Sequence, residues 1–91
     1  MEEYGIHLLV TGKVQGVYYR ESTQKKARAY QLTGWVKNRD DGRVELKAFG
    51  AKDAVDQLLA FCRKGPILAR VQSLDMRECL SEEHDGFVVM S

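Results

Sequence analysis

A glycine-containing loop separates a predicted strand from a predicted helix near the start of the chain. An apolar run over residues 6–10 precedes the loop, which reads Gly12-Lys13-Val14-Gln15-Gly16-Val17-Tyr18-Tyr19-Arg20, and a helical pattern over residues 21–32 follows it. The first N–H groups of a helix have no partner within the helix, and the helix dipole adds positive potential there, so such junctions attract anions. The planar guanidinium of Arg20 can grip phosphate or carboxylate oxygens with two parallel hydrogen bonds. The sequence therefore predicts a phosphate-binding loop with its own cation.

Length and charge favour one small domain over residues 1–91, because a chain of 91 residues builds a single core. A net charge of +1 provides neither a broad basic field for nucleic acid nor a basic arm for a membrane surface. No apolar run approaches the roughly 20 residues of a membrane-spanning helix, and Met1-Glu2-Glu3-Tyr4 lacks the features of a signal peptide. We therefore expect a cytoplasmic monomer without nucleic-acid or membrane partners.

The thiol and imidazole groups are few. Cys62 lies on the apolar face of a predicted helix, and we expect it to be buried, as free cysteines usually are. Cys79 lies in a polar stretch, and a disulfide between the two stays open, although two widely spaced cysteines in a cytoplasmic chain are usually reduced. Besides these, only His7 and His84 are available, and their spacing fits no metal site. We expect no metal and no cofactor.

Hydrophobic periodicity predicts strands and helices along the whole chain. Strands are expected over residues 6–10, 35–38, 43–49, 68–76 and 86–90, with the turn Asp40-Asp41-Gly42 joining the second to the third. The helix over residues 21–32 buries Thr23, Ala27 and Tyr30. A second helix begins near Ala51 and ends at Gly65-Pro66, and its apolar face carries Val55, Leu58, Leu59 and Cys62. Residues 77–85 are polar and are expected to form a loop.

This order of elements is typical of an α+β fold, the ferredoxin-like sandwich. Its mostly antiparallel sheet, here of four to five strands, carries two helices on one face. In that topology the first two strands are parallel and the third lies between them, so the carboxyl ends of the first two share one edge. The glycine-containing loop leaves the first strand, and Asn38 ends the second. We therefore expect Asn38 to lie beside the loop, although 18 positions separate it from Arg20.

Two segments resemble the signatures of the acylphosphatase family. The loop that ends at Arg20 is similar to the first signature, and Gly34-Trp35-Val36-Lys37-Asn38-Arg39-Asp40-Asp41-Gly42-Arg43-Val44, continued to Gly50, is similar to the second. The spacing of the two segments and the chain length also fit, and weaker likeness extends to Gly65-Pro66 and Ala69-Arg70-Val71. The resemblance implies a ferredoxin-like sandwich. It also implies an enzyme that hydrolyses the carboxyl–phosphate anhydride bond of small acyl phosphates to carboxylate and inorganic phosphate.

The resemblance also implies residue roles. It assigns phosphate binding to Arg20, water positioning to Asn38, and the phosphate cradle to Gln15, Gly16, Val17, Tyr18, Tyr19 and Arg20. The leaving carboxylate of an acyl phosphate needs no proton, so the protein has only to hold the phosphoryl oxygens and place a water. The neutral amide of Asn38 can donate and accept hydrogen bonds, and thus can hold a water without acting as a base.

Two other functions fit the same pattern. Ferredoxin-like sheets also bind RNA through aromatic residues on the open face. Here that face would offer His7, Leu9, Arg43, Glu45, Lys47 and Phe49, a mixed-charge set that disfavours RNA. Acylphosphatase-like domains also occur in hydrogenase-maturation carbamoyltransferases, where they act on carbamoyl phosphate, which is a second candidate substrate. The sequence does not identify the acyl group.

Overall fold

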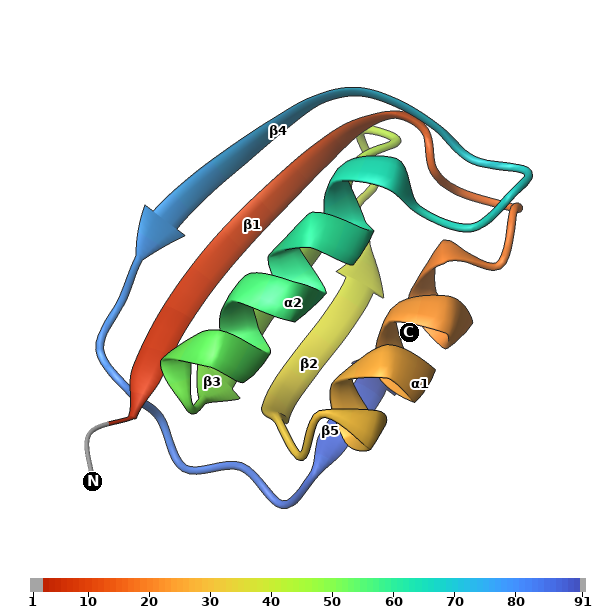
Figure 1. Cartoon of the computed structure of the whole chain (residues 1–91). Helices are drawn as coiled ribbons and strands as arrows, with labels where there is room; N and C mark the ends of the chain where they lie inside the picture. Colours follow the sequence, from red (N-terminus) through yellow and green to blue (C-terminus); the bar gives the residue numbers. More distant parts are fainter. Residues whose placement is uncertain (1–2, 91) are drawn as a thin grey trace.

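A computed structural model describes residues 3–90 as one sheet covered by two helices. In chain order the elements are β1 (Tyr4–Lys13), α1 (Tyr19–Ala29), β2 (Thr33–Asn38), β3 (Val44–Gly50), α2 (Lys52–Lys64), β4 (Arg70–Glu78) and β5 (Phe87–Met90). The strand order is β4-β1-β3-β2-β5, and both helices cover the same face (Figure 1). β3 pairs antiparallel with β1 and β2, β4 pairs antiparallel with β1, and β5 pairs parallel with β2. The predicted ferredoxin-like α+β architecture is confirmed.

The core lies between the helices and alternate residues of the strands. Ile6, Leu8 and Val10 of β1 are fully buried, whereas the side chains of the residues between them project to the opposite face. Their partners in the register on β3 are Ala48, Leu46 and Val44, which are also fully buried. The helices close this layer with small or apolar residues: Thr23 and Ala27 from α1, and Val55, Leu58 and Cys62 from α2. This register places the carboxyl ends of β1 and β2 on the same side of the sheet, where both strands end.

Helix α1 spans Tyr19–Ala29, so it begins and ends earlier than residues 21–32, over which it was expected. Tyr18 precedes it in the left-handed region with φ 66°, which turns the chain into the helix two residues early. At the other end Gln31 has φ 60° and its N–H donates to Arg28 O at 3.0 Å, while Leu32 N–H donates to Ala27 O at 2.8 Å. These two bonds form a Schellman motif, which ends the helix and sends Leu32 into the core.

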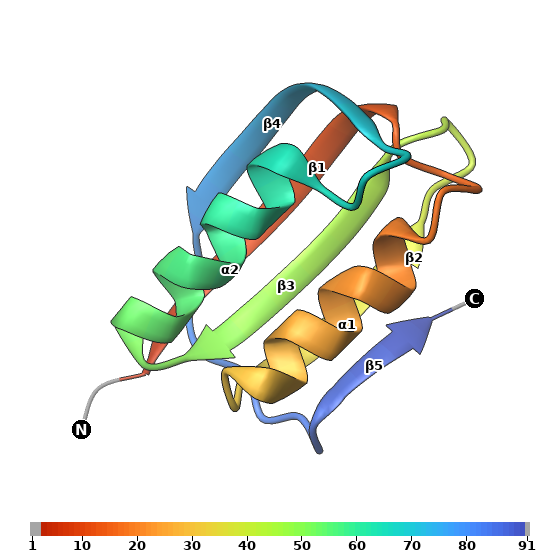
Figure 2. The same cartoon turned by 45° about the vertical axis from the view of Figure 1, so that its right-hand side comes forward.

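Strand β4 begins and ends two residues later than the expected 68–76. The Ala69 N–H donates to Pro66 O at 2.9 Å, which closes a turn and delays the strand. The connection to β5 therefore covers residues 79–86, not 77–85. Because β4 and β5 lie at opposite edges of the sheet, it passes across one end of the molecule (Figure 2). His84 of this connection stacks on Phe49 with ring centroids 5.6 Å apart, so the connection is attached to the sheet.

Substitution of Gly34 would test how closely β2 approaches β3. It has φ 137°, and a Cβ there would collide with the backbone carbonyl of Lys47. We expect Gly34→Ala to lower the free energy of unfolding, measured by urea denaturation, by about 3 kcal/mol, from backbone strain plus overpacking. Gly42 has φ 92° but open space around it, so Gly42→Ala should cost only the strain, about 1–2 kcal/mol. If both variants lost the same free energy of unfolding, the predicted collision of a Cβ at Gly34 with the Lys47 carbonyl would be contradicted.

Candidate active site

A hollow of about 220 Å³ opens at the edge of the sheet where β1 and β2 both end. Its lining comes from the β1–α1 loop, the first turn of α1 and the last residue of β2: Val14, Gly16, Tyr18, Tyr19, Arg20, Glu21 and Asn38. The structure thus brings Arg20 and Asn38 to one cavity, as the parallel arrangement of the first two strands predicts.

The β1–α1 loop offers unpaired backbone donors to this hollow. Within residues 3–90, the N–H groups of residues 16–20 donate to no acceptor, and no side chain caps α1. Gly16 has φ 75°, and a Cβ there would meet nothing within 4 Å, so space for a ligand adjoins the loop. Unpaired N–H groups at a helix start favour an anion, because the helix dipole acts in the same direction.

Arg20 supplies the cation of the hollow from the first turn of α1. Its guanidinium Nη1 donates to Met90 O at 3.4 Å, a long and therefore weak hydrogen bond. No carboxylate within residues 3–90 forms an ion pair with Arg20. A guanidinium has five N–H donors in a planar fork, so most of this group is available to an anion.

Asn38 closes the hollow from the sheet. It is the last residue of β2 and faces Val44 of β3 in the register. Its Oδ1 atom is buried and has no hydrogen-bond partner within residues 3–90. Leaving a buried acceptor unpaired costs about 1–3 kcal/mol, so a donor that reached this oxygen would stabilise the site.

The expected cradle residues divide into two groups. Gly16, Tyr18, Tyr19 and Arg20 line the hollow, whereas Gln15 and Val17 do not. Val17 is buried in the core, and the Gln15 side chain bonds to the β2–β3 turn. Val14 and Glu21 line the hollow as well. The early start of α1 brings Glu21 there, and this was missed because the sequence shows no side-chain cap that would reveal that start.

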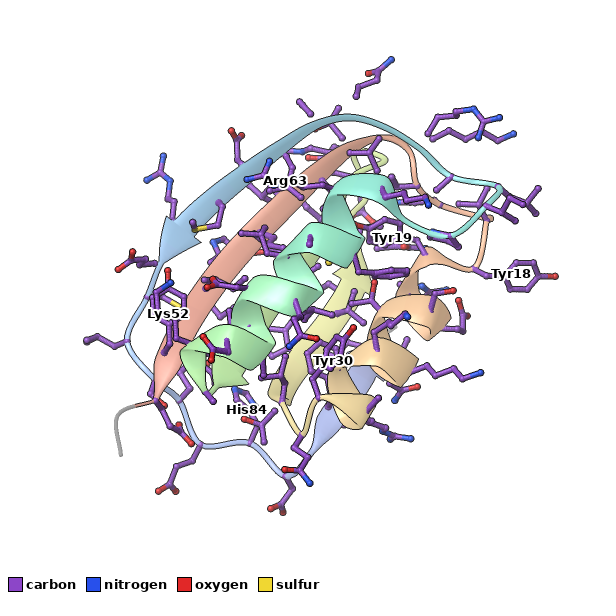
Figure 3. The ribbon with its side chains drawn as sticks, viewed as in Figure 1. Tyr18, Tyr19, Tyr30, Lys52, Arg63 and His84 are labelled. Atoms are coloured by element: carbon purple, nitrogen blue, oxygen red, sulfur yellow. The ribbon has the colours of Figure 1, made fainter. Side chains whose placement is uncertain are left out.

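The two tyrosines beside Arg20 point in different directions. Tyr18 extends into solvent away from the body of the molecule, whereas Tyr19 points inward between the helices (Figure 3). The Tyr19 hydroxyl donates to Cys62 O at 2.6 Å, and burial raises the pKa of this phenol far above its usual range. Tyr19 is therefore neutral and anchors the loop to α2, while its backbone remains at the hollow.

Other reactive groups lie away from this hollow or are unreactive. Cys62 is fully buried, as predicted, and burial raises the pKa of its thiol to about 12, so it is not a thiolate at neutral pH. Cys62 and Cys79 are both free. Within residues 3–90, no cluster of His, Cys, Asp and Glu could hold a metal ion. A larger hollow, of about 430 Å³, is lined by Glu3, Thr33, Glu82, Glu83, His84 and Asp85, a set that repels anions.

Charge is distributed unevenly along the sheet. At the end with the smaller hollow, basic side chains outnumber the acidic Glu21, Asp40 and Asp41. The basic ones come from β1, the β2–β3 turn, the end of α2 and the start of β4: Lys13, Arg39, Arg63, Lys64 and Arg70. The opposite end carries acidic ones: Glu3, Asp53, Asp56, Glu82, Glu83 and Asp85. Such an arrangement attracts anions toward the Arg20 end, although the net charge is only +1.

Comparison with known proteins identifies the family. The family model described as Acylphosphatase matches residues 6–89. This chain belongs to the acylphosphatase family. It is 55% identical over 86 residues to an acylphosphatase of Methylococcus capsulatus, covering 93% of this chain and 94% of the relative. The resemblance inferred from the two motifs is thereby confirmed.

Solved structures give the same result. The structure of an acylphosphatase from Coxiella burnetii matches with a TM-score of 0.93 and 45% identity, covering 97% of this chain and 93% of that one. The structure of HypF from T. kodakarensis matches with a TM-score of 0.83 and 27% identity, covering 97% of this chain but only 12% of that one. None of the helices described in residues 3–90 is both long and apolar enough to span a bilayer.

Arg20 should dominate anion binding in this acylphosphatase-family site. We expect Arg20→Gln to weaken the binding of inorganic phosphate at least about 10-fold, because it removes a charge-assisted pair of hydrogen bonds. Isothermal titration calorimetry measures this loss. Arg28→Gln changes an exposed arginine on the same helix and should leave the affinity almost unchanged. Equal losses for the two variants would mean that only general charge matters.

Proposed function

We propose that this member of the acylphosphatase family hydrolyses small acyl phosphates through Arg20 and Asn38. The observation that carries the proposal is the shared hollow. It is lined by Arg20, which has no carboxylate partner within residues 3–90, and by Asn38, whose buried amide oxygen has no hydrogen-bond partner there. An anion and a water are the two ligands that these groups suit. Acyl phosphate hydrolysis needs both, side by side.

In the proposed complex the phosphoryl group occupies the β1–α1 loop. The backbone N–H groups of residues 16–20 surround its oxygens, and the Arg20 guanidinium pairs with two of them. These donors are fixed by the fold before the substrate arrives, so little reorganisation is needed as charge redistributes in the transition state. Phosphoryl transfer depends mainly on positioning and electrostatic stabilisation of this kind.

Asn38 places the attacking water. Its Oδ1 accepts one water hydrogen, which directs an oxygen lone pair toward phosphorus on the side opposite the acyl group. The new bond joins the water oxygen to phosphorus, and the bond from phosphorus to the acyl oxygen breaks, with its electron pair leaving on the carboxylate. The proton released by the water passes to a phosphoryl oxygen. An acyl phosphate dianion and water thereby give a carboxylate and dihydrogen phosphate.

This scheme needs no histidine or carboxylate as base. His7 lies on the open face of the sheet, where its Nε2 is 2.7 Å from Glu45 Oε2. His84 lies in the connection 79–86, against Phe49. Neither lines the hollow with Arg20. Glu21 does line it, and the scheme assigns no proton transfer to this side chain.

The open face gives little support to the RNA-binding alternative. Glu45 receives hydrogen bonds from His7 and Arg39, and Lys47 pairs with Glu82. Phe49, the aromatic residue expected there, is fully buried. Paired charges and a covered ring offer neither a basic surface nor a stacking platform. The absence of a nucleic-acid partner, the monomeric state and the cytoplasmic location remain predictions.

Substitution of Asn38 should impair catalysis but not the binding of inorganic phosphate. We expect Asn38→Ala to lower kcat by about 100- to 1000-fold, the typical cost of one preorganised polar group, while the affinity for inorganic phosphate changes little. Hydrolysis of acetyl, benzoyl and carbamoyl phosphate without added metal measures this effect and ranks the candidate acyl groups. Arg20→Gln should lower turnover at least as much and weaken phosphate binding too. If either variant kept near-normal turnover, the substituted residue would not have its proposed role in the site.

The histidines should be dispensable. We expect the variant with both His7→Gln and His84→Gln to keep kcat within about threefold of the parent protein, whereas loss of a general base costs about 100-fold or more. Its pH–rate profile between about pH 5.5 and 8, the range in which an ordinary histidine titrates, should superimpose on that of the parent. A step in the parent profile that disappears in this variant would identify a histidine base and contradict the scheme.

A further inference from the structure

The Gln15 side chain joins the phosphate loop to the β2–β3 turn. Its amide nitrogen Nε2 lies 2.8 Å from Arg39 O and 2.9 Å from Arg43 O, within hydrogen-bond range of both. A side-chain amide has two N–H donors, so these two carbonyls use its whole donor capacity. Both bonds are partly buried and therefore sheltered from competing water. Gln15 thus contacts the turn and not the hollow.

The two carbonyls belong to the residues that close the turn. Arg39 N–H donates to Arg43 O at 2.8 Å, and Gly42 N–H donates to Arg39 O at 3.2 Å. Arg39 directly follows Asn38 in the chain, so its carbonyl lies one residue beyond the catalytic amide. A shift of Arg39 can displace Asn38, because the two residues are joined by one peptide bond and their Cα atoms stay about 3.8 Å apart.

The other contacts at this turn do not reach the loop. Asp41 pairs with Arg39 at 3.2 Å and with Arg43 at 2.8 Å, but these groups are well exposed, and exposed ion pairs contribute little to stability. Arg39 also donates to Glu45 on β3 at 3.2 Å, which ties the turn to the sheet. Among these side-chain contacts, those of Gln15 alone extend from the turn to the loop that ends at Arg20.

We propose that Gln15 is a positioning residue that fixes Asn38 relative to the phosphate loop. This inference rests on the proposed function, in which Asn38 places the water and the loop holds the phosphoryl group. In-line attack requires the water and phosphorus to keep a fixed separation, and a misplacement of about 1 Å can cost about 100-fold in rate. Gln15 sets that separation through its two bonds, while the N–H donors that hold the phosphoryl group remain independent of its side chain.

The first test separates catalysis from anion binding. Gln15→Met keeps the length of the side chain and removes both donors. We expect kcat for benzoyl phosphate to fall by about 10- to 100-fold, while the dissociation constant of inorganic phosphate changes by less than about threefold. An unchanged kcat would overturn the proposal. So would a loss of phosphate affinity as large as the loss of kcat, because Gln15 would then act on the cradle.

Gln24 provides a matched control. It is also a glutamine whose Nε2 donates to a backbone carbonyl of another element, Phe87 O at 3.0 Å, and it is partly buried. Gln24→Met should lower stability in urea to a similar extent without the loss of kcat. Gln15→Glu, with no N–H donors, is a second variant of the same length. If both Gln15 variants unfold under assay conditions and Gln24→Met does not, Gln15 serves stability and the proposal is overturned.

The decisive experiment combines Gln15→Met with Asn38→Ala. If Gln15 acts through Asn38, the substitution should lower kcat by less than about twofold in the Asn38→Ala background, because coupled residues are not additive. If the full loss persists there, Gln15 acts by another route and this inference fails while the proposed function stands. If Asn38→Ala alone keeps normal turnover, the proposed role of Asn38 fails first, and the two failures are distinguished.

Discussion

The site depends on the pairing of β3 with both of its neighbours. β3 runs antiparallel to β1 and to β2, so β1 and β2 must run parallel, and both end at the same edge of the sheet. The fully buried residues on these three strands leave little freedom to shift the register, because a one-residue slip would turn every core side chain to the opposite face. Arg20 and Asn38 therefore meet because of the core, although neither belongs to it.

Glu21 apart, the proposed chemistry at that meeting point relies on neutral and permanently charged groups. The amide of Asn38, the backbone N–H groups of the loop and the guanidinium of Arg20 do not change protonation state near neutral pH. Of the titratable groups with strongly altered pKa values, Tyr19 borders the hollow, whereas Cys62 and Asp41 do not line it. Burial raises the pKa of Tyr19 and of Cys62, while hydrogen bonds from Arg43 lower the pKa of Asp41. These shifts accompany structural contacts, so an altered pKa alone would not have led to this site.

Sequence patterns were sufficient for the fold and for the placing of Arg20 and Asn38 at one hollow. Alternation in the strands, the amphipathic second helix and the two family motifs predicted the sandwich and the approach of Asn38 to Arg20. The boundaries of α1 and β4 were wrong, because they depend on local backbone choices: a left-handed Tyr18, a Schellman motif at Gln31 and a turn at Ala69. The bonds of the Gln15 side chain to the β2–β3 turn were not foreseen, because a motif does not reveal where a side chain points.

The separation of charge along the sheet has a consequence for the product as well as for the substrate. Because basic and acidic side chains predominate at opposite ends, the molecule is an electric dipole. This dipole favours an orientation in which the Arg20 hollow faces an approaching phosphate before contact. Inorganic phosphate is also an anion, and in the proposed site the same field attracts it and the same donors would hold it. A site tuned for faster capture would therefore release its product more slowly. Capture and release are thus opposing demands on one set of basic side chains.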